Sequence, residues 1–196
     1  MTTVFIAGSI TIKHLDEKVQ ERIMNIVTKE FDVIVGDADG VDTSIQQFLL
    51  DVNYHRVTVY CTGDEPRNNV GRWAIRQVKS YAKPGSRAFF TAKDLEMAKN
   101  ADNGLMVWDT KSTGTLSNVI ELLQRNKTSW VFVNKAKTLH AVKNIDDLEL
   151  LLGYMPPPAR IKADTKIDLT SKIEGLRSRA LQMAILAERA GTTLSV

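Results

Sequence analysis

Residues 32–42 read Asp32-Val33-Ile34-Val35-Gly36-Asp37-Ala38-Asp39-Gly40-Val41-Asp42, an apolar run followed by a polar loop that contains two glycines. Apolar residues then recur at helical spacing, at Val41, Ile45, Phe48 and Leu49. A run without polar alternation is typical of a strand buried on both faces, as in the middle of a parallel sheet. The stretch therefore predicts a strand, a loop at its carboxyl end and a helix, which is the repeating unit of α/β proteins.

Four further apolar runs have the same character, and segments with helical periodicity lie between them. The runs are Val4–Ala7, Val57–Tyr60, Leu105–Trp108 and Trp130–Val133, and the helical faces are Leu15, Val19, Ile23, Ile26, Val27 and Leu116, Val119, Ile120, Leu123. We therefore expect an α/β fold, a Rossmann-like three-layer sandwich with a mostly parallel central sheet. Residues 1–134 form this domain in our interpretation.

The segment from Thr62 to Asn100 is longer than a single crossover requires. It predicts a helix over residues 72–81, a turn at Pro84-Gly85-Ser86 and a second helix over residues 92–100.

Residues 135–196 are expected to form a C-terminal helical extension. An irregular strand and a short helix near residues 145–152 precede the prolines at 156–158, which we interpret as a hinge or spacer. An amphipathic helix follows over about residues 166–190, with an apolar seam at Leu169, Ile173, Leu176, Ala180, Met183 and Ala187. Two interpretations stay open: the helix packs on its own domain, or it joins a second subunit in a homo-oligomer.

Composition narrows the class of protein. The chain has 196 residues, of which 43% are hydrophobic and 25% charged, as in an ordinary globular protein. The net charge of +3 arises entirely after residue 155, so the main body is neutral and matches a nucleic-acid backbone poorly. The apolar runs are only a few residues long, far from the roughly 20 that cross a bilayer. We expect neither a nucleic-acid nor a membrane partner.

Cofactor, metal and compartment predictions follow from motifs that are missing. The single cysteine, Cys61, forms no internal disulfide, and the N-terminus has no leader pattern, so we expect a cytoplasmic protein. His14, His55 and His140 share no ligand spacing with Cys61, which argues against a zinc site. The Gly-x-Gly-x-x-Gly fingerprint and the P-loop are both absent, so we predict no cofactor.

Polar and glycine residues directly follow four of the predicted strands. In a doubly wound sheet these loops line the ligand crevice, and helix N-termini there offer free N–H groups to a phosphate. The candidate ligand-binding residues are Gly8, Ser9, Gly36, Asp37, Asp39, Gly40, Asp42, Arg67, Asn68, Asp109, Ser112, Thr113, Gly114 and Thr115. Residues 113–115 are the best phosphate cradle, and Arg67 adds a planar donor fork that either binds an anion or pairs with Asp64 or Glu65.

The order of these motifs resembles the SLOG superfamily of Rossmann-like domains. The resemblance covers roughly residues 3–134 and is carried by residues 6–9, 36–42, 67–68, Asp102 and 112–115. It implies binding of a nucleotide or nucleotide-derived ligand, with residues 8–9, 67 and 112–115 at phosphate and residues 37–42 near ribose. Relatives in that superfamily include phosphoribohydrolases, the DNA-processing protein DprA and nucleoside deoxyribosyltransferases.

One departure from the family pattern bears on catalysis. Phosphoribohydrolases of that superfamily carry a glutamate where this chain has Asn118, and an amide does not act as a carboxylate base or nucleophile. Glu121, or the carboxylates of Asp37, Asp39, Asp42 and Asp109, are the available substitutes. We therefore place a binding module first, as a sensor or sequestering protein, and keep an N-glycosidase-type hydrolase or transferase as the alternative. Whether the protein is an enzyme stays open.

A third reading is a Mg²⁺-dependent phosphatase. An apolar strand followed by Asp37-Ala38-Asp39-Gly40-Val41 matches the Asp-x-Asp-x-Val motif of haloacid-dehalogenase-type enzymes, in which the first aspartate attacks phosphorus. In those enzymes the motif follows the first strand, whereas here it follows the second.

Overall fold

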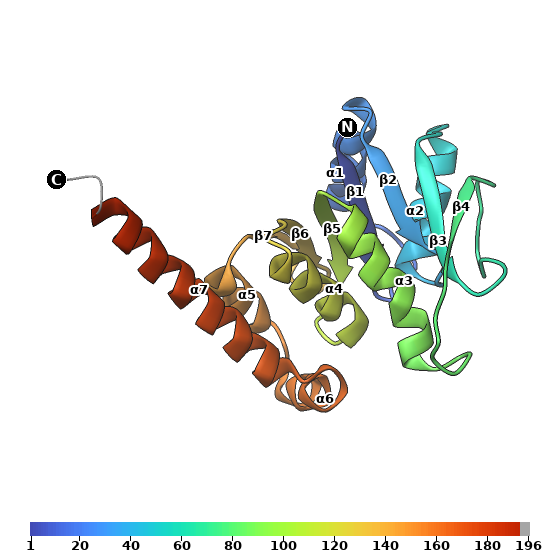
Figure 1. The fold of residues 1–196 in the computed structure, drawn as a ribbon. Helices are drawn as coiled ribbons and strands as arrows, with labels where there is room; N and C mark the ends of the chain where they lie inside the picture. The colour runs from blue at the N-terminus through green and yellow to red at the C-terminus, as the bar shows by residue number, and fades with distance from the viewer. Residues whose placement is uncertain (193–196) are drawn as a thin grey trace.

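The computed structural model describes the backbone of residues 1–192 and the side chains of residues 1–187. Within that range the chain forms one seven-stranded sheet with helices on both faces (Figure 1). The strands are β1 (Thr3–Gly8), β2 (Asp32–Gly36), β3 (Val57–Thr62), β4 (Ala74–Val78), β5 (Asn103–Trp108), β6 (Ser129–Val133) and β7 (Thr138–Val142). The helices are α1 (Glu17–Thr28), α2 (Val41–Asp51), α3 (Arg87–Asn100), α4 (Thr113–Gln124), α5 (Ile145–Leu152), α6 (Pro157–Ile167) and α7 (Leu169–Thr192).

The strand order is β4-β3-β2-β1-β5-β6-β7, with every neighbouring pair parallel except β6 and β7. The chain moves outward from β1 in one direction and then returns to place β5 on the other side of β1. The switch point of the topology thus lies between β1 and β5, where open α/β sheets carry their ligand crevice. The predicted Rossmann-like α/β class is confirmed.

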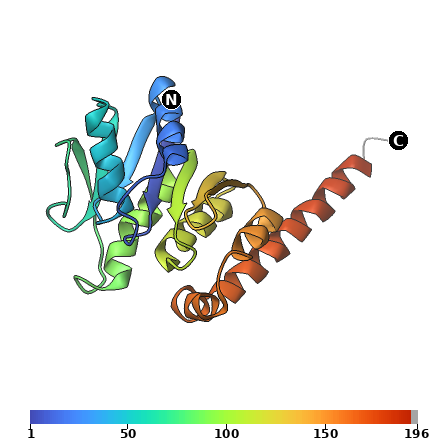
Figure 2. The same ribbon diagram turned by 180° about the vertical axis from the view of Figure 1, so that it is seen from behind.

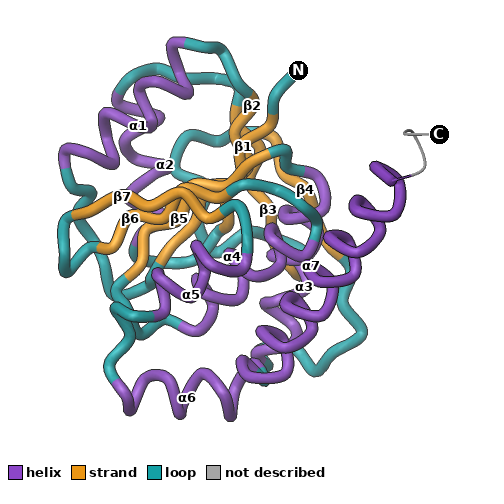
Figure 3. The backbone as a smooth tube through the Cα atoms, turned by 90° about the vertical axis from the view of Figure 1, so that its left-hand side faces the viewer, coloured by secondary structure: helices purple, strands orange, loops and turns teal. Residues whose placement is uncertain are grey.

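Three layers are visible when the sheet is viewed near its edge (Figure 3). Helices α1 and α2 cover one face through Val19, Ile23, Ile45 and Leu49, all fully buried. Helices α3 and α4 cover the other face, and the core there continues into α5, α6 and α7. The five predicted apolar runs are β1, β2, β3, β5 and β6, and burial on both faces explains their continuous apolarity.

The helix predicted over residues 72–81 is wrong, because residues 74–78 form the edge strand β4. Trp73, just before it, is buried, and its indole N–H donates to the Tyr54 carbonyl at 3.0 Å. Asn69 holds the Trp73 backbone from both sides, accepting from its N–H and donating to its carbonyl. The buried Trp73 therefore positions residues 74–78 beside the free edge of β3, where they form the backbone hydrogen bonds of a parallel strand pair. The second helix, α3, begins at residue 87, earlier than expected, because the Ser86 side chain caps it.

The prolines at 156–158 begin a helix instead of forming a hinge or spacer. Pro156 is the N-cap of α6 and Pro157 its first residue, a position where proline's missing N–H costs nothing. Asp168, with a φ of 54°, separates α6 from α7. The boundary proposed at residue 134 falls in the turn between the paired strands β6 and β7.

The predicted amphipathic helix corresponds to α7, and its apolar seam divides into two parts. Leu169, Ile173 and Leu176 are buried against the core, whereas Met183 is 58% exposed. Arg179 still donates to the Gln124 carbonyl at the end of α4, and the last part of the helix then extends away from the rest of the molecule (Figures 1 and 2). No helix within residues 1–192 is both long and apolar enough to span a membrane.

Because one hydrophobic cluster runs from α3 and α4 into α7, we expect a Leu152→Ala substitution to destabilise the sheet as well as the extension. Leu152 is 1% exposed, and the loss of a buried leucine costs about 2–5 kcal/mol. Urea unfolding monitored by circular dichroism should show one transition with a lower midpoint. Leu150→Ala, at a side chain 73% exposed on the same helix, is the matched control. Two separate transitions would show that the extension folds independently.

Candidate functional site

Ser9 joins the loops that follow β1, β2 and β5 at the carboxyl edge of the sheet. Its backbone N–H donates to the Val107 carbonyl, and its own carbonyl accepts from the Val41 N–H at the start of α2. Its hydroxyl donates to Asp109 Oδ2 at 2.8 Å. Ser9 is 1% exposed, so it connects elements at the topological switch point and is closed to a ligand. The predicted meeting of these loops is present, but this side chain serves the fold.

Asp109 accepts four hydrogen bonds. The donors are the Ser9 and Thr11 hydroxyls and the backbone N–H groups of Lys111 and Ser112. Although burial alone raises the pKa of Asp109, these donors lower it below the ordinary value, because they stabilise the carboxylate. Its carboxylate therefore holds the loop that leads into α4.

Arg67 pairs with Asp37, not with Asp64 or Glu65. Its Nε and Nη2 donate to the two carboxylate oxygens at 3.1 and 2.7 Å, and its backbone N–H adds a third bond. Its guanidinium carbon lies 4.4 Å from the centre of the Phe90 ring. The Asp37 side chain is 2% exposed, whereas the Arg67 side chain is 43% exposed, so part of Arg67 stays open to solvent.

Asn68 also connects the loop after β3 to the loop after β2. Its side-chain amide donates to the Asp37 carbonyl at 2.9 Å and to Asp39 Oδ1 at 3.0 Å. The loops after β2 and β3 are therefore joined side by side, as the topology predicts for neighbouring parallel strands. Most of the polar residues of these two loops that we predicted to bind a ligand hydrogen-bond to one another.

Lys93 is the central residue that sequence reasoning missed. It lies on α3, is 4% exposed, and its ammonium is 2.9 Å from Asp94 and 3.8 Å from Asp37. The carboxylates around it, those of Asp37, Asp42 and Asp94, keep the pKa of Lys93 above its ordinary value in spite of burial. One feature of the sequence could have indicated this residue: Lys93 stands at a helix position that has to face the buried sheet.

Gly36 provides the space for this ammonium. A Cβ at residue 36 would lie 2.4 Å from Asp42 Oδ2 and 2.6 Å from Lys93 Nζ. Gly40 has a φ of 76°, and a Cβ there would meet the Ile10 backbone at 2.4 Å. Gly8, at the end of β1, lies against the Val107 carbonyl in the same way. These three predicted binding residues are thus glycines because of packing.

Asp42 is 4% exposed at the first turn of α2. Burial raises its pKa to about 7, and the nearby Lys93 ammonium opposes that rise. For Asp37, burial is outweighed by the hydrogen bonds from Arg67, so its pKa lies below the ordinary value. The pKa of Asp42 therefore lies near neutral pH, whereas that of Asp37 does not.

The first turn of α4 carries residues 112–115. Ser112 Oγ caps the helix by accepting from the Thr115 N–H, and the N–H groups of Thr113 and Gly114 have no acceptor in the described part of the chain. A Cβ at Gly114 would meet nothing nearer than 4.0 Å, so the space beside it is open. Arg87, at the start of α3, donates to the Thr113 hydroxyl at 3.1 Å.

A depression of about 540 Å³ opens at the same edge of the sheet. It is lined by Ile10, Lys13, Ala38, Asp39, Gly40, Thr43, Ser44 and Arg67. Three predicted residues, Asp39, Gly40 and Arg67, border it, whereas Ser9 and residues 112–115 do not. Lys13 is a further cation at the depression that sequence reasoning missed, and it forms no ion pair within the described residues.

Of the substitutes considered for the missing glutamate, Asp37 and Asp109 accept from neighbouring donors and Asp42 is buried, whereas Asp39 is exposed at the depression. Glu121 accepts from the Arg125 guanidinium at 2.6 Å on the outer part of α4. Both carboxylate oxygens of Asp37 are occupied by Arg67, which also leaves no free nucleophile for the phosphatase reading. In the part of the chain that the structure describes, no three acidic, histidine or cysteine side chains are grouped to hold a metal ion.

Two comparisons with known proteins were negative: no protein-family model and no curated protein matches the chain.

The raised pKa of Asp42 predicts how stability depends on pH. Between the unfolded value of about 3.9 and about 7, the folded protein holds a proton at Asp42 that the unfolded chain has released, so stability falls as pH rises through this window. Since one pH unit is worth about 1.4 kcal/mol, the loss is at most roughly 4 kcal/mol. Chemical unfolding from pH 4.5 to 8 should show a shallower decline in Asp42→Asn than in the native chain.

Asp51→Asn is the matched control, because Asp51 is exposed at the other end of α2. It should keep the slope of the native chain. Equal slopes in Asp42→Asn and the native chain would contradict the assignment of the proton to Asp42.

Proposed function

We propose that the protein binds a nucleotide-type ligand, such as a nucleoside monophosphate, at the carboxyl edge of the sheet. The observation that carries the proposal is the depression that places Lys13 and Arg67 beside the first turn of α2. Its volume of about 540 Å³ lies within the range of roughly 300–1,000 Å³ typical of small-molecule sites.

The start of α2 suits an anion. Its N-cap is Gly40, which has no side chain to accept from the helix, and the N–H groups of Asp42 and Thr43 have no acceptor among the described residues. Free N–H groups at a helix start carry a partial positive charge. Together with the Lys13 ammonium and the exposed part of Arg67, they favour phosphate, and the Asp39 carboxylate at the same depression suits ribose hydroxyls.

The start of α4 offers a second place for a phosphorylated group. The N–H groups of Thr113 and Gly114, which find no acceptor in residues 1–192, lie near the Arg87 guanidinium, and the space beside Gly114 is open. Ser9 connects α2 to the Asp109 loop, so both helix starts belong to one edge of the sheet. The resemblance to SLOG domains agrees with a ligand that extends along this edge.

Binding is better supported than catalysis. Asp37 and Asp109 accept hydrogen bonds from neighbouring donors, Asp42 is buried, and Asp39 at the depression accepts from the Asn68 amide through one carboxylate oxygen. General acid–base work needs a carboxyl group within hydrogen-bond reach of the substrate. A sensor or sequestering role therefore stands first, and cleavage of an N-glycosidic bond is the alternative.

Calorimetric titration with AMP tests the proposal. We expect Lys13→Gln to weaken AMP binding about tenfold, which equals a loss of roughly 1.4 kcal/mol. Arg87→Gln should weaken it similarly if the ligand extends to α4. Lys29→Gln, at an exposed cation on the opposite edge of the sheet, is the control and should leave the affinity unchanged. Absence of AMP, GMP and ADP-ribose binding at millimolar concentration would overturn the proposal.

Chromatography of the same mixtures separates binding from hydrolysis. Release of free base above background, lost in Gly114→Trp, would replace the binding module by the N-glycosidase. Mg²⁺-dependent phosphate release lost in Asp37→Asn would replace it by the phosphatase.

We also propose that a second copy of the chain packs on the outer half of α7. Leu181, Met183, Ile185 and Leu186 are 64%, 58%, 40% and 63% exposed on a helix that leaves the core (Figure 2). Exposed apolar residues scattered singly are ordinary, but here four lie within six residues. Leu181 and Ile185 are one turn apart on one side of α7, and Met183 and Leu186 lie on the other side, so together they form an apolar patch around the helix.

Light scattering during size-exclusion chromatography tests this partner. The full chain should have twice the monomer mass of 21.9 kDa, and the double substitution Leu181→Glu with Ile185→Glu should return it to the monomer. The matched control is Ile161→Glu on α6, which is 70% exposed but outside the patch. A native chain that is monomeric at about 100 µM, far above the Kd of a stable dimer, would contradict self-association.

A further inference from the structure

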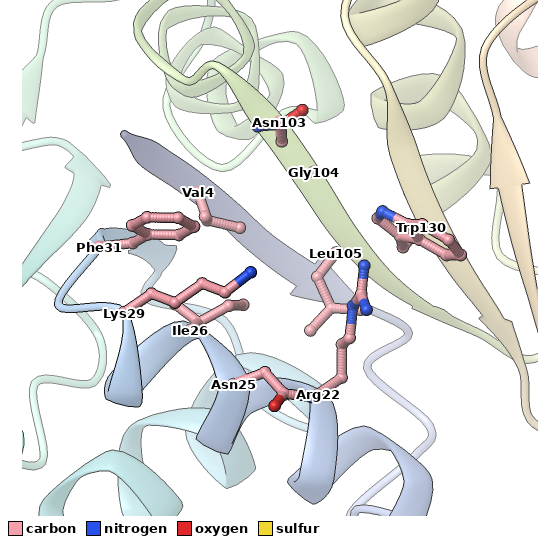
Figure 4. A pocket seen from close by; sticks show the side chains of 10 residues that line it. All are labelled: Val4, Arg22, Asn25, Ile26, Lys29, Phe31, Asn103, Gly104, Leu105 and Trp130. Carbon is pink, nitrogen blue, oxygen red and sulfur yellow. The ribbon is translucent and has the colours of Figure 1, made fainter. Parts of the chain in front are cut away.

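A second hollow lies near the amino-terminal ends of the strands, between the sheet and α1 (Figure 4). It has a volume of about 170 Å³ and begins at Val4 in β1, Asn103 in β5 and Trp130 in β6. Asn103 and Trp108 are the two ends of β5, roughly 16 Å apart at about 3.3 Å per residue. The hollow is therefore separate from the depression at the carboxyl edge and independent of the function proposed above.

The charged side chains of this hollow are all cationic. Arg22 of α1 and Lys29, which caps its end, extend into it, and none of its ten lining residues is acidic (Figure 4). Seven residues correspond to two helical turns, so both cations lie on one side of α1, roughly 10 Å apart along its axis. Neither forms an ion pair within the described residues. The amides of Asn25 and Asn103 also line the hollow.

The walls and floor are apolar. Phe31 and Trp130 lie at opposite sides of the hollow, and Val4, Ile26 and Leu105 line it between them (Figure 4). The guanidinium carbon of Arg22 lies 4.2 Å from the centre of the Trp130 ring, within cation–π distance. The Arg22 N–H groups donate to no acceptor within the described residues, so they are available to a ligand.

Size and chemistry together define a class of ligand. The hollow is smaller than the roughly 300–1,000 Å³ of sites for nucleotides and drug-sized molecules. An apolar floor between two aromatic side chains suits a single flat ring, and a guanidinium with free N–H groups suits a carboxylate. We propose that this hollow binds a small aromatic carboxylate, with the carboxylate at Arg22 and the ring over the apolar floor.

Calorimetric titration of the full chain with benzoate, up to about 10 mM because so small a ligand binds weakly, tests this site. Benzamide, with the same ring and no charge, and cyclohexanecarboxylate, with the same charge and no flat ring, are the comparison ligands. Benzoate should bind at least tenfold more tightly than either. Arg22→Gln should reduce the benzoate affinity at least tenfold, and Lys29→Gln should reduce it less, because Lys29 is more exposed.

Lys18→Gln is the matched control on α1, since Lys18 donates to the Lys137 carbonyl and does not line the hollow. It should keep the native affinity, as should Lys13→Gln at the other edge. Thermal unfolding confirms that each variant is folded before titration. The proposal is overturned if benzoate does not bind, if benzamide binds equally well, or if folded Arg22→Gln retains the native affinity. Because AMP binding is tested by Lys13→Gln, the two proposals fail separately.

Discussion

A buried ammonium needs carboxylates around it, and this requirement organises the carboxyl edge of the sheet. Removing the partners of a buried charge costs several kcal/mol, so Lys93 holds Asp37, Asp42 and Asp94 close to it. Through Asp37 the network continues to Arg67 and thus to the loop after β3. The network therefore connects α3, the start of α2 and two strand-end loops. What remains open at this edge is the depression beside Lys13.

The same fold presents two different cationic hollows at opposite ends of its strands. At the carboxyl edge, positive charge comes from free N–H groups at helix starts together with Lys13 and Arg67. No helix start lines the hollow at the amino edge, and its charge comes only from the Arg22 and Lys29 side chains beside aromatic rings. The first arrangement favours phosphate, and the second favours a flat carboxylate.

Of the C-terminal helices, α5, α6 and the first half of α7 pack into the core, whereas the second half of α7 is exposed. Leu148 and Leu152 of α5, Ala163 of α6 and Leu169 of α7 continue the cluster formed by α3 and α4. The sheet thus gains an antiparallel edge strand and a helical cover from the part of the chain expected to be an appendage. The outer half of α7 has no such partner within the described residues, and its apolar side chains stay exposed.

The sequence determined the α/β class, five of the six parallel strands and the edge of the sheet at which the polar loops gather. These features follow from local patterns, because a strand buried on both faces must be continuously apolar and parallel strands end at one edge. The pairings were decided by tertiary structure alone. Lys93 and Asp37 are 56 residues apart in the sequence. No local pattern indicates that the Arg67 guanidinium pairs with Asp37 and not with its sequence neighbours Asp64 and Glu65. The strand at residues 74–78 likewise exists because Trp73 is anchored to Tyr54 beside an open sheet edge, which no local preference encodes.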